Sequence, residues 1–233
     1  MRTRIKFCGL VRPDDVRTAV ALGVDAIGFV FYPKSPRFLE LAEAAALRRL
    51  LPSYVTAVGL FVGGSGETIA RTAQAAGLDV IQFHGDEPRE QCERDLPPGL
   101  AYWRAVRVRN QADLLESFAC FGRGSQGAVP GAEALLLDSF SAGYGGSGAS
   151  FDWNWIPAQP ALPIVLSGGL TPESVGAAVR CVRPMMVDVS SGIQAAEPPD
   201  PRAKSRQRME RFVAEVLRAD ALIQDENEAV RSS

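Results

Sequence analysis

Residues 163–191, PIVLSGGLTPESVGAAVRCVRPMMVDVSS, contain one full unit of the pattern that decides the fold. Two short apolar runs, 163–169 and 185–191, flank a segment at 173–182 in which apolar residues recur with helical spacing. Thr171 and the proline after it stand where a hydroxyl side chain and a proline commonly begin a helix. The stretch therefore predicts a buried strand, a helix and a second buried strand, which is one βα unit of a parallel sheet.

The same alternation covers most of the chain. Six further apolar runs precede this unit, at residues 5–10, 25–31, 56–62, 80–85, 101–108 and 134–140. The runs begin about every 20 to 33 residues, with no break long enough for an interdomain linker. Eight repeats in 233 residues predict a single (β/α)8 TIM barrel with parallel strands and an active site at the C-terminal face. A doubly wound open sheet has the same local pattern but usually fewer strands, so the repeat count favours the barrel.

We expect the barrel domain to occupy residues 1–220 and a polar, frayed C-terminal tail to occupy residues 221–233. The sixth crossover contains a glycine-rich stretch, 141–150, which leaves only 151–156 for a helix, so a short or irregular helix is expected there. Longer helices are expected at 14–22, 41–51, 67–76, 89–95, 111–121, 173–182 and 202–218.

Positive charge is not in excess, because 25 Lys and Arg residues stand against 27 Asp and Glu residues, a formal net charge of −2. Without surplus cations to hold a phosphate backbone, nucleic-acid binding is not expected. No apolar run approaches the roughly 18 residues that span a membrane, and the residues after Met1 do not resemble a signal-peptide core. We expect a globular, cytoplasmic protein that does not contact membranes.

The chain has four cysteines and one histidine, His84. The cysteines have no CxxC spacing, and a chain of this length can bury a core without disulfide bonds, so a reducing compartment is expected. A single imidazole cannot supply a zinc site built on several histidines, and we expect no metal site.

Two side chains suited to proton transfer are expected at strand ends. Cys8 ends the first run, and Lys6 points to the same face, where its charge could lower the pKa of the thiol. Asp138 follows three leucines at the end of the sixth run, where a carboxyl group can serve as general acid. The alternatives are a small apolar core residue at Cys8 and a loop cap at Asp138. Asp188 is expected to form a structural salt bridge with Lys6, because strands one and eight are neighbours in a closed barrel.

Glycines and serines follow the last two apolar runs. Gly168 and Gly169 come after the seventh run, and Ser190, Ser191 and Gly192 come after the eighth. Barrels commonly hold a phosphate on the backbone N–H groups of these two loops. Together the two loops predict a small phosphorylated substrate.

Two further residues are candidates for substrate contact. Arg37, in a loop stiffened by two prolines, could hold a carboxylate through two parallel hydrogen bonds or lie in a solvated basic turn. His84 ends the fourth run and could contact substrate, although a lone histidine is more often structural. The segment 143–148 matches GxGxxG, but no long helix follows, so it is interpreted as a mobile loop over the site or a plain linker.

A series of short blocks follows the strand ends in order: KFCGL at 6–10, GFVFYPKSPRF at 28–38, VGLFV at 58–62, QFHGDE at 82–87, LLDSF at 136–140, GGSG at 145–148, FDW at 151–153, LSGGL at 166–170 and VDVSSGI at 187–193. Taken together, these blocks resemble those of the phosphoribosylanthranilate isomerase family, whose members catalyse an Amadori isomerisation in tryptophan biosynthesis. The resemblance implies a barrel that needs neither metal nor organic cofactor. It also implies conversion of N-(5-phosphoribosyl)anthranilate to 1-(2-carboxyphenylamino)-1-deoxyribulose 5-phosphate by general acid–base catalysis.

The resemblance implies a role for each matching residue. Cys8 is expected to be the general base, Asp138 the general acid and Arg37 the group that binds the anthranilate carboxylate. The loops after the seventh and eighth strands are expected to hold the phosphate.

The chain departs from the family pattern near its C-terminal third. Gln194 stands where Glu is common, and Lys204 and Ser205 stand where a Lys-Asp pair is common, so roles at these positions stay open. The basic residues between Arg202 and Arg211 are expected to form a solvated face.

Two other functions fit the same barrel. A Schiff-base lyase would need a nucleophilic lysine at a strand end, and only Lys6 lies in a strand. A non-catalytic protein that binds phosphorylated metabolites would need neither proton-transfer group. Monomer and homodimer remain alternatives, as does acceptance of the related aminoimidazole carboxamide substrate of histidine biosynthesis.

Overall fold

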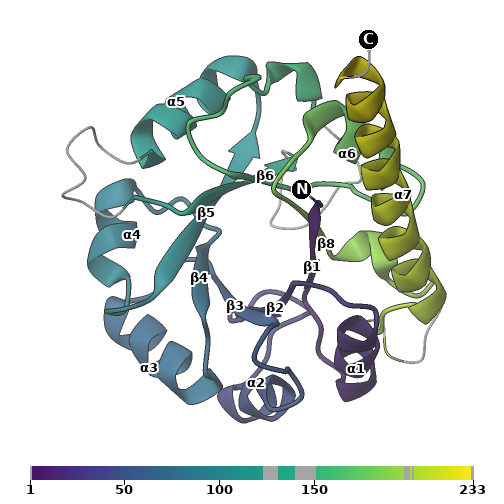
Figure 1. Ribbon diagram of the computed structural model, residues 1–233. Helices are drawn as coiled ribbons and strands as arrows, with labels where there is room; N and C mark the ends of the chain where they lie inside the picture. The colour runs from purple at the N-terminus through teal and green to yellow at the C-terminus, as the bar shows by residue number, and fades with distance from the viewer. Residues whose placement is uncertain (1, 123–130, 140–150, 197–199, 201, 232–233) are drawn as a thin grey trace.

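Eight parallel strands close into a barrel in the computed structural model of this chain (Figure 1). The structure describes residues 2–122, 131–139, 151–196, 200 and 202–231. Because the last strand pairs with the first, the expected TIM barrel is confirmed and the open sheet is wrong. The strands are β1 (Arg4–Cys8), β2 (Ala26–Val30), β3 (Thr56–Phe61), β4 (Val80–Phe83), β5 (Ala101–Val108), β6 (Ala134–Ser139), β7 (Ile164–Leu166) and β8 (Met186–Val189).

Helices surround the strands as an outer layer (Figure 1). Within its described residues, 151–163, the sixth crossover forms a 3₁₀ turn, η1 (Trp153–Trp155), in agreement with the short or irregular helix expected there, and a second such turn, η2 (Ser191–Ile193), follows β8. The α-helices are α1 (Pro13–Ala21), α2 (Leu41–Arg48), α3 (Gly66–Ala76), α4 (Arg89–Asp95), α5 (Gln111–Phe121), α6 (Val175–Val182) and α7 (Arg206–Arg231).

Alternation along the strands divides the core into two layers. One cluster includes Ala26, Val58 and Leu136 from the inner faces of the strands and fills the barrel. The larger cluster lies between strands and helices, where the ring of Phe7 meets that of Phe212 on α7 edge to face at 5.9 Å. The strands are buried on both faces, which explains why their sequences are continuously apolar.

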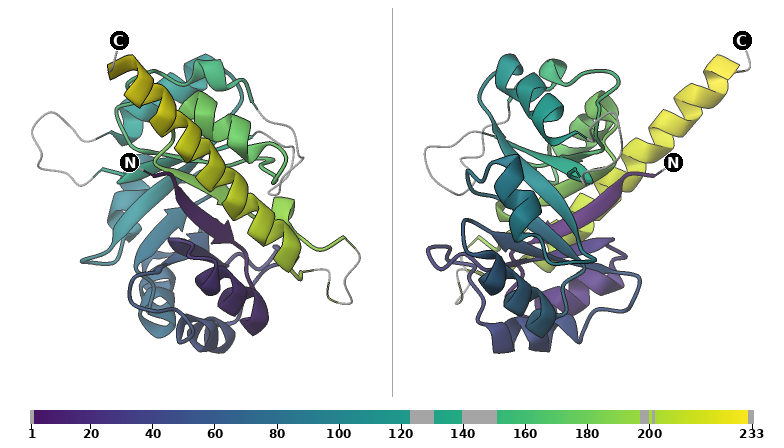
Figure 2. Two further views of the ribbon diagram at one scale, coloured as in Figure 1. Left: turned by 45° about the vertical axis from the view of Figure 1, so that its right-hand side comes forward. Right: turned by 90° about the vertical axis from the view of Figure 1, so that its left-hand side faces the viewer.

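The last helix is longer than expected. α7 contacts α6 and α1, and Met209, Phe212 and Val216 on it are fully buried. Its C-terminal part leads away from the barrel (Figure 2) and remains helical to Arg231, whereas a frayed tail was expected from residue 221. Ala, Glu and Gln are good helix formers, and they extend a helix whose first half is already fixed by packing.

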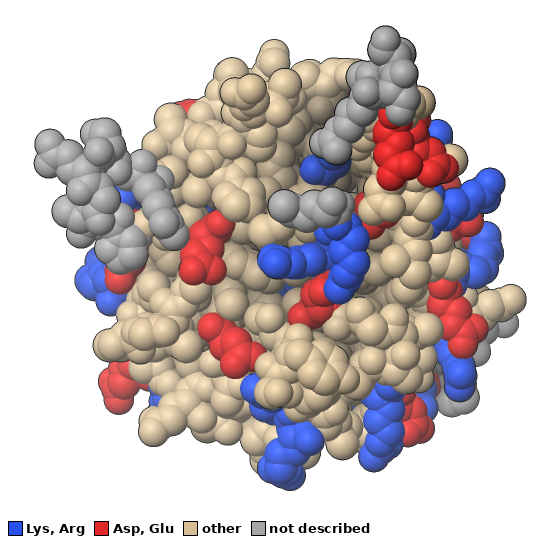
Figure 3. Space-filling model, in the orientation of Figure 1, with Lys and Arg blue, Asp and Glu red and all other residues tan. Residues whose placement is uncertain are grey.

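Within the described part of the chain, no helix is long and apolar enough to cross a membrane. On the face drawn in Figure 3, Lys and Arg side chains lie among Asp and Glu side chains, and neither sign forms a continuous field.

Candidate active site

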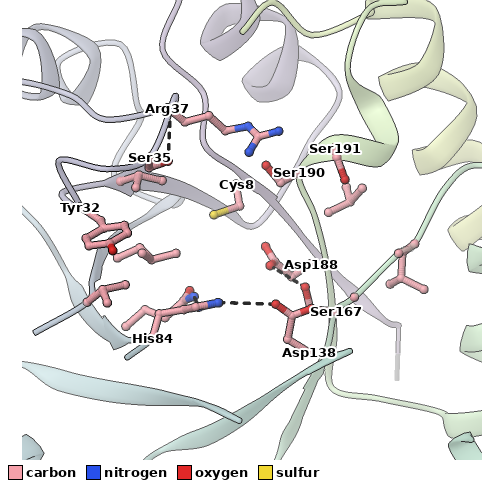
Figure 4. Close-up of a pocket in the computed structure, with 18 residues that line it drawn as sticks. Cys8, Tyr32, Ser35, Arg37, His84, Asp138, Ser167, Asp188, Ser190 and Ser191 are labelled. Atoms are coloured by element: carbon pink, nitrogen blue, oxygen red, sulfur yellow. Dashed lines mark hydrogen bonds and ion pairs between the residues drawn. The ribbon is translucent and has the colours of Figure 1, made fainter. Parts of the chain in front are cut away.

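A pocket opens at the carboxyl ends of the strands (Figure 4). Its walls come from the ends of seven strands and the segments that follow them, which is the face where barrel enzymes carry their sites. The described residues that line it are Cys8, Val30, Tyr32, Ser35, Arg37, Leu60, Val62, Gln82, His84, Asp138, Ser167, Gly168, Gly169, Leu170, Asp188, Val189, Ser190 and Ser191.

Cys8 lies at the end of β1 above a buried ion pair. Nζ of Lys6 is 2.8 Å from Oδ1 of Asp188, and the expected salt bridge between β1 and β8 is thereby confirmed. A Cβ built on Gly28 would lie 2.7 Å from Sγ of Cys8 and 3.1 Å from Nζ of Lys6, so glycine at this position leaves room for both groups. The second oxygen of Asp188 accepts a hydrogen bond from Ser167 Oγ at 3.0 Å, which links the pair to the end of β7.

Burial and neighbouring charges together set the protonation of Cys8 and Lys6. It raises the pKa of the Cys8 thiol, and the nearby Lys6 charge, which acts in the opposite direction, does not compensate. The expected lowering of this pKa is therefore wrong. For Lys6, burial alone would lower the pKa, but the charges of Asp188 and Cys8 outweigh it and the pKa is raised. Lys6 is thus a permanent cation below the thiol.

Asp138 ends β6 on another side of the pocket, facing His84 (Figure 4). Nε2 of His84 is 3.5 Å from Oδ2 of Asp138, and Nδ1 of His84 lies 2.7 Å from Nε2 of Gln82. Gln82 is completely buried, so the imidazole is held between a fixed amide and the carboxyl group. The three residues form a polar chain from β4 to β6.

Arg37 reaches over the pocket from the loop after β2. One guanidinium nitrogen donates to Oε1 of Gln194 at 2.7 Å, and the backbone N–H of Arg37 donates to Ser35 Oγ at 3.1 Å. The side chain lies against Gly9, where a Cβ would be only 2.4 Å from Arg37 Cδ and where φ is +68°. Glycine after Cys8 therefore allows the arginine to approach the end of β1.

The two expected anion-binding loops lie side by side at the pocket. Gly168 has φ +81°, and a Cβ there would be 2.3 Å from the backbone nitrogen of Ser139, so only glycine fits. Gly169, Ser190 and Ser191 line the pocket as well. Gly192 is not among the described lining residues. A Cβ on it would be 1.9 Å from the Leu170 carbonyl oxygen, so Gly192 allows the loops after β7 and β8 to touch.

Lys204 was expected to lie on a solvated basic face, and this prediction is wrong. Its side chain is buried, and its Nζ donates to the Ser190 carbonyl oxygen at 2.8 Å. The pKa of the Lys204 ammonium group is lowered to about 7, mainly because the group is buried and secondly because of the nearby Arg37 charge.

The sequence prediction missed Gln82 and left the roles of Gln194 and Lys204 open. Gln82 had a usable signal, because a glutamine inside an apolar run and two residues before His84 must share its face. Gln194 and Lys204 stood out only as departures from the family pattern, and the antiparallel bridge between them, which sets their positions, has no local sequence signal. The segment interpreted as a loop over the site, 143–148, lies outside the described residues.

One pocket of this (β/α)8 barrel thus contains a thiol, a carboxyl group and an arginine next to two glycine loops. These features define the class of the protein: a barrel enzyme that transfers protons on a small anionic substrate. Residues 5–197 match the family model described as N-(5'phosphoribosyl)anthranilate (PRA) isomerase. An N-(5'-phosphoribosyl)anthranilate isomerase of Dechloromonas aromatica is 48% identical over 223 residues, which cover 96% of this chain and all of that protein. The chain belongs to the PRA isomerase family.

Solved structures agree with this assignment. The phosphoribosyl anthranilate isomerase of Thermotoga maritima is 36% identical, with a TM-score of 0.81 and coverage of 92% of this chain and 98% of that one. Another phosphoribosyl anthranilate isomerase, 34% identical with a TM-score of 0.77 and the same coverage, was solved with reduced 1-(o-carboxyphenylamino)-1-deoxyribulose 5-phosphate. The predicted family, fold and isomerase activity in tryptophan biosynthesis are confirmed, and the lyase and binding-protein alternatives are set aside.

Proposed function

We propose that the chain converts N-(5'-phosphoribosyl)anthranilate to 1-(2-carboxyphenylamino)-1-deoxyribulose 5-phosphate with Asp138 as general acid and Cys8 as general base. The observation that supports this assignment is that the two groups point into one pocket from β6 and β1 (Figure 4). A substrate held between them would meet an acid on one side and a base on another.

Asp138 acts in the ring-opening step. Its carboxyl proton passes to the ribose ring oxygen while the nitrogen lone pair forms a C=N bond to C1 and the C1–O bond breaks. The product of this step is an open-chain protonated imine with a hydroxyl on C4. His84, 3.5 Å from the carboxyl group, orients it toward the ring oxygen.

Cys8 acts in the second step. Its thiolate removes the proton from C2, and the C–H electron pair forms a C1=C2 double bond while the imine nitrogen becomes neutral. The resulting enolamine tautomerises, with loss of the O2 proton and gain of a proton at C1, to the ketone. The proton that Cys8 gains balances the one that Asp138 gives up.

Binding rests on the remaining groups of the pocket. Arg37 holds the anthranilate carboxylate, because a guanidinium group matches a carboxylate with two parallel hydrogen bonds. Gly168, Gly169, Ser190 and Ser191 hold the phosphate through their backbone N–H groups. Gly192 contributes by keeping the two loops in contact. This arrangement fixes both ends of the substrate with the reacting carbons between them.

The proposal also includes the cellular compartment, the oligomeric state and the partners of the enzyme. It works in the cytoplasm as a monomer or homodimer, without a nucleic-acid partner, and the near balance of 25 basic and 27 acidic residues supports the last point.

Loss of anthranilate fluorescence tests the mechanism. Phosphoribosylanthranilate is made in situ and mixed with the wild-type protein, Asp138→Asn or Cys8→Ser. Rapid loss in the wild type and a large decrease in each variant are expected. Binding of the reduced product analogue by both variants serves as the folding control. Near-wild-type turnover in either variant would overturn its assigned role.

A further inference from the structure

Lys204 lies in the segment between η2 and α7, directly beneath the loop that follows β8. It is 5% exposed, and its Nζ is 2.8 Å from the Ser190 carbonyl oxygen and 3.4 Å from Ser190 Oγ. Its backbone N–H donates to Oδ2 of Asp15 at 3.1 Å. Both the backbone and the side-chain end of Lys204 are therefore held by hydrogen bonds, and the ammonium group holds Ser190 at the wall of the pocket.

Charged and titratable groups reach Lys204 from four elements. These groups are Arg37 from the loop after β2, Cys8 from β1, Asp15 from α1 and Asp188 from β8. Asp188 is bound to Lys6 and Ser167, and Asp15 bonds the backbone of Lys204 rather than its ammonium group.

Within the described ranges, no carboxylate lies within ion-pair distance of the Lys204 ammonium group or of the Arg37 guanidinium group. Arg37 donates instead to the neutral amide of Gln194, and its buried Nε has no partner among those residues. Two basic side chains, Lys204 and Arg37, therefore flank the pocket without a bonded carboxylate. An anion in the pocket would supply the missing negative charge.

We propose that Lys204 is a positioning residue that couples the binding of an anionic ligand at the loop after β8 to the uptake of one proton. In the free protein its lowered pKa of about 7, caused by burial and then by Arg37, leaves it largely neutral at pH 8. A bound anion favours the ammonium form, which then holds Ser190 more firmly. This inference rests on the proposed anion subsite.

Isothermal titration calorimetry measures the number of protons taken up when the ligand binds. The reduced product analogue is titrated into the protein at pH 8 in two buffers with different enthalpies of protonation. Its phosphate group is already a dianion at this pH, so the ligand itself contributes little. The wild type is expected to take up about 0.9 proton for each ligand bound, which follows from a pKa of about 7 in the free protein.

Two substitutions separate positioning from simple structural support. Lys204→Arg keeps a positive charge at all accessible pH values, so binding should persist with proton uptake near zero. Lys204→Met should lose the uptake and raise KM about tenfold, the size of one hydrogen bond to a charged group, while kcat changes little. Cys8→Ser should retain the uptake. Thermal melts of all variants check folding, and the wild-type measurement needs no variant.

The outcomes are distinct. Tight binding by the wild type without proton uptake would overturn the role of Lys204 and leave the proposed function intact. Uptake that persists in Lys204→Arg would assign the proton to another group and also overturn the inference. Absence of any binding by the wild type would overturn the proposed anion subsite and this inference with it.

Discussion

Lys6 and Asp188 lie opposite each other in the register between β1 and β8, with Nζ 2.8 Å from Oδ1 and both side chains buried. The contact joins the first strand to the last directly below Cys8. Asp188 also accepts from Ser167, so one carboxylate connects three neighbouring strand ends of the barrel. The seam that closes the fold is thus part of the floor of the pocket.

Removal of one partner of this pair should destabilise the fold. Lys6→Met and Asp188→Leu should each lower the free energy of unfolding by about 3–5 kcal/mol, because the remaining charge is buried without its partner. The double variant should cost less than the sum of the two. Urea unfolding measures these changes in the free energy of unfolding. Arg206→Met is the control, because Arg206 forms an exposed ion pair with Glu210, and its loss should lower the free energy of unfolding by less than about 1 kcal/mol. Additive losses would contradict a direct interaction.

Asp138→Asn should reduce kcat by about 10² to 10⁴, the usual contribution of a general acid, because an amide cannot supply the proton. KM should change little. Asp152→Asn is a suitable control, since Asp152 is an exposed carboxylate that caps η1 outside the pocket. A variant that keeps normal kcat would show that the acid lies elsewhere.

Cys8 gives a prediction about pH. Because burial raises the pKa of the thiol, only a small fraction is thiolate near neutrality, and this fraction grows as pH rises. We expect kcat to increase from pH 7 to pH 9 and to lose this dependence in Cys8→Ser, whose residual rate should be about 10² to 10⁴ lower. A maximum of kcat below pH 7 would be inconsistent with Cys8 as base.

Arg37→Lys should raise KM by about 10- to 100-fold, because a lysine cannot form two parallel hydrogen bonds to a carboxylate. The substitution also removes the geometry of the bond to Gln194. Lys34 lies in the same loop but is exposed, so Lys34→Met should leave KM within about twofold. Equal effects of the two substitutions would mean that the loop contributes only a diffuse positive charge.

Much of this architecture follows from local patterns. The limits of β3 and β4 lie within two residues of the limits of the apolar runs at 56–62 and 80–85, and α5 has the expected limits, Gln111–Phe121. The rule that barrel sites lie at the carboxyl ends of strands was enough to place Cys8, Asp138 and Arg37 at one pocket.

What could not be predicted depends on long-range packing. Cys8 and Lys6 were placed on one face, but the balance between burial and charge at the thiol is set by the surrounding strands. Lys204 lies in a polar stretch that resembles a surface segment, and its burial follows from the bridge to Gln194 and the bond to Asp15. The length of α7 beyond residue 220 depends on helix propensity in a region without apolar periodicity.

The buried lysine also makes stability depend on pH. The pKa of Lys204 falls from its ordinary value of 10.5 to about 7 on folding, so the unfolded chain binds more protons between these two values. Stability therefore rises with pH in this window, and the cost of the buried lysine is largest at and below pH 7. Relative to Lys204→Met, the wild type should gain about 2 kcal/mol of unfolding free energy between pH 7 and pH 9.

Chemical unfolding of the two proteins at a series of pH values measures this difference. Comparison with Lys204→Met removes the contribution of Lys6, whose raised pKa does not depend on Lys204 and affects both proteins alike. Lys34→Met provides the matched control, because it removes a lysine from an exposed loop position and should leave the pH dependence of stability unchanged. A difference between wild type and Lys204→Met that stays constant from pH 7 to pH 9 would mean that Lys204 is charged throughout this range, in which case burial does not set its protonation.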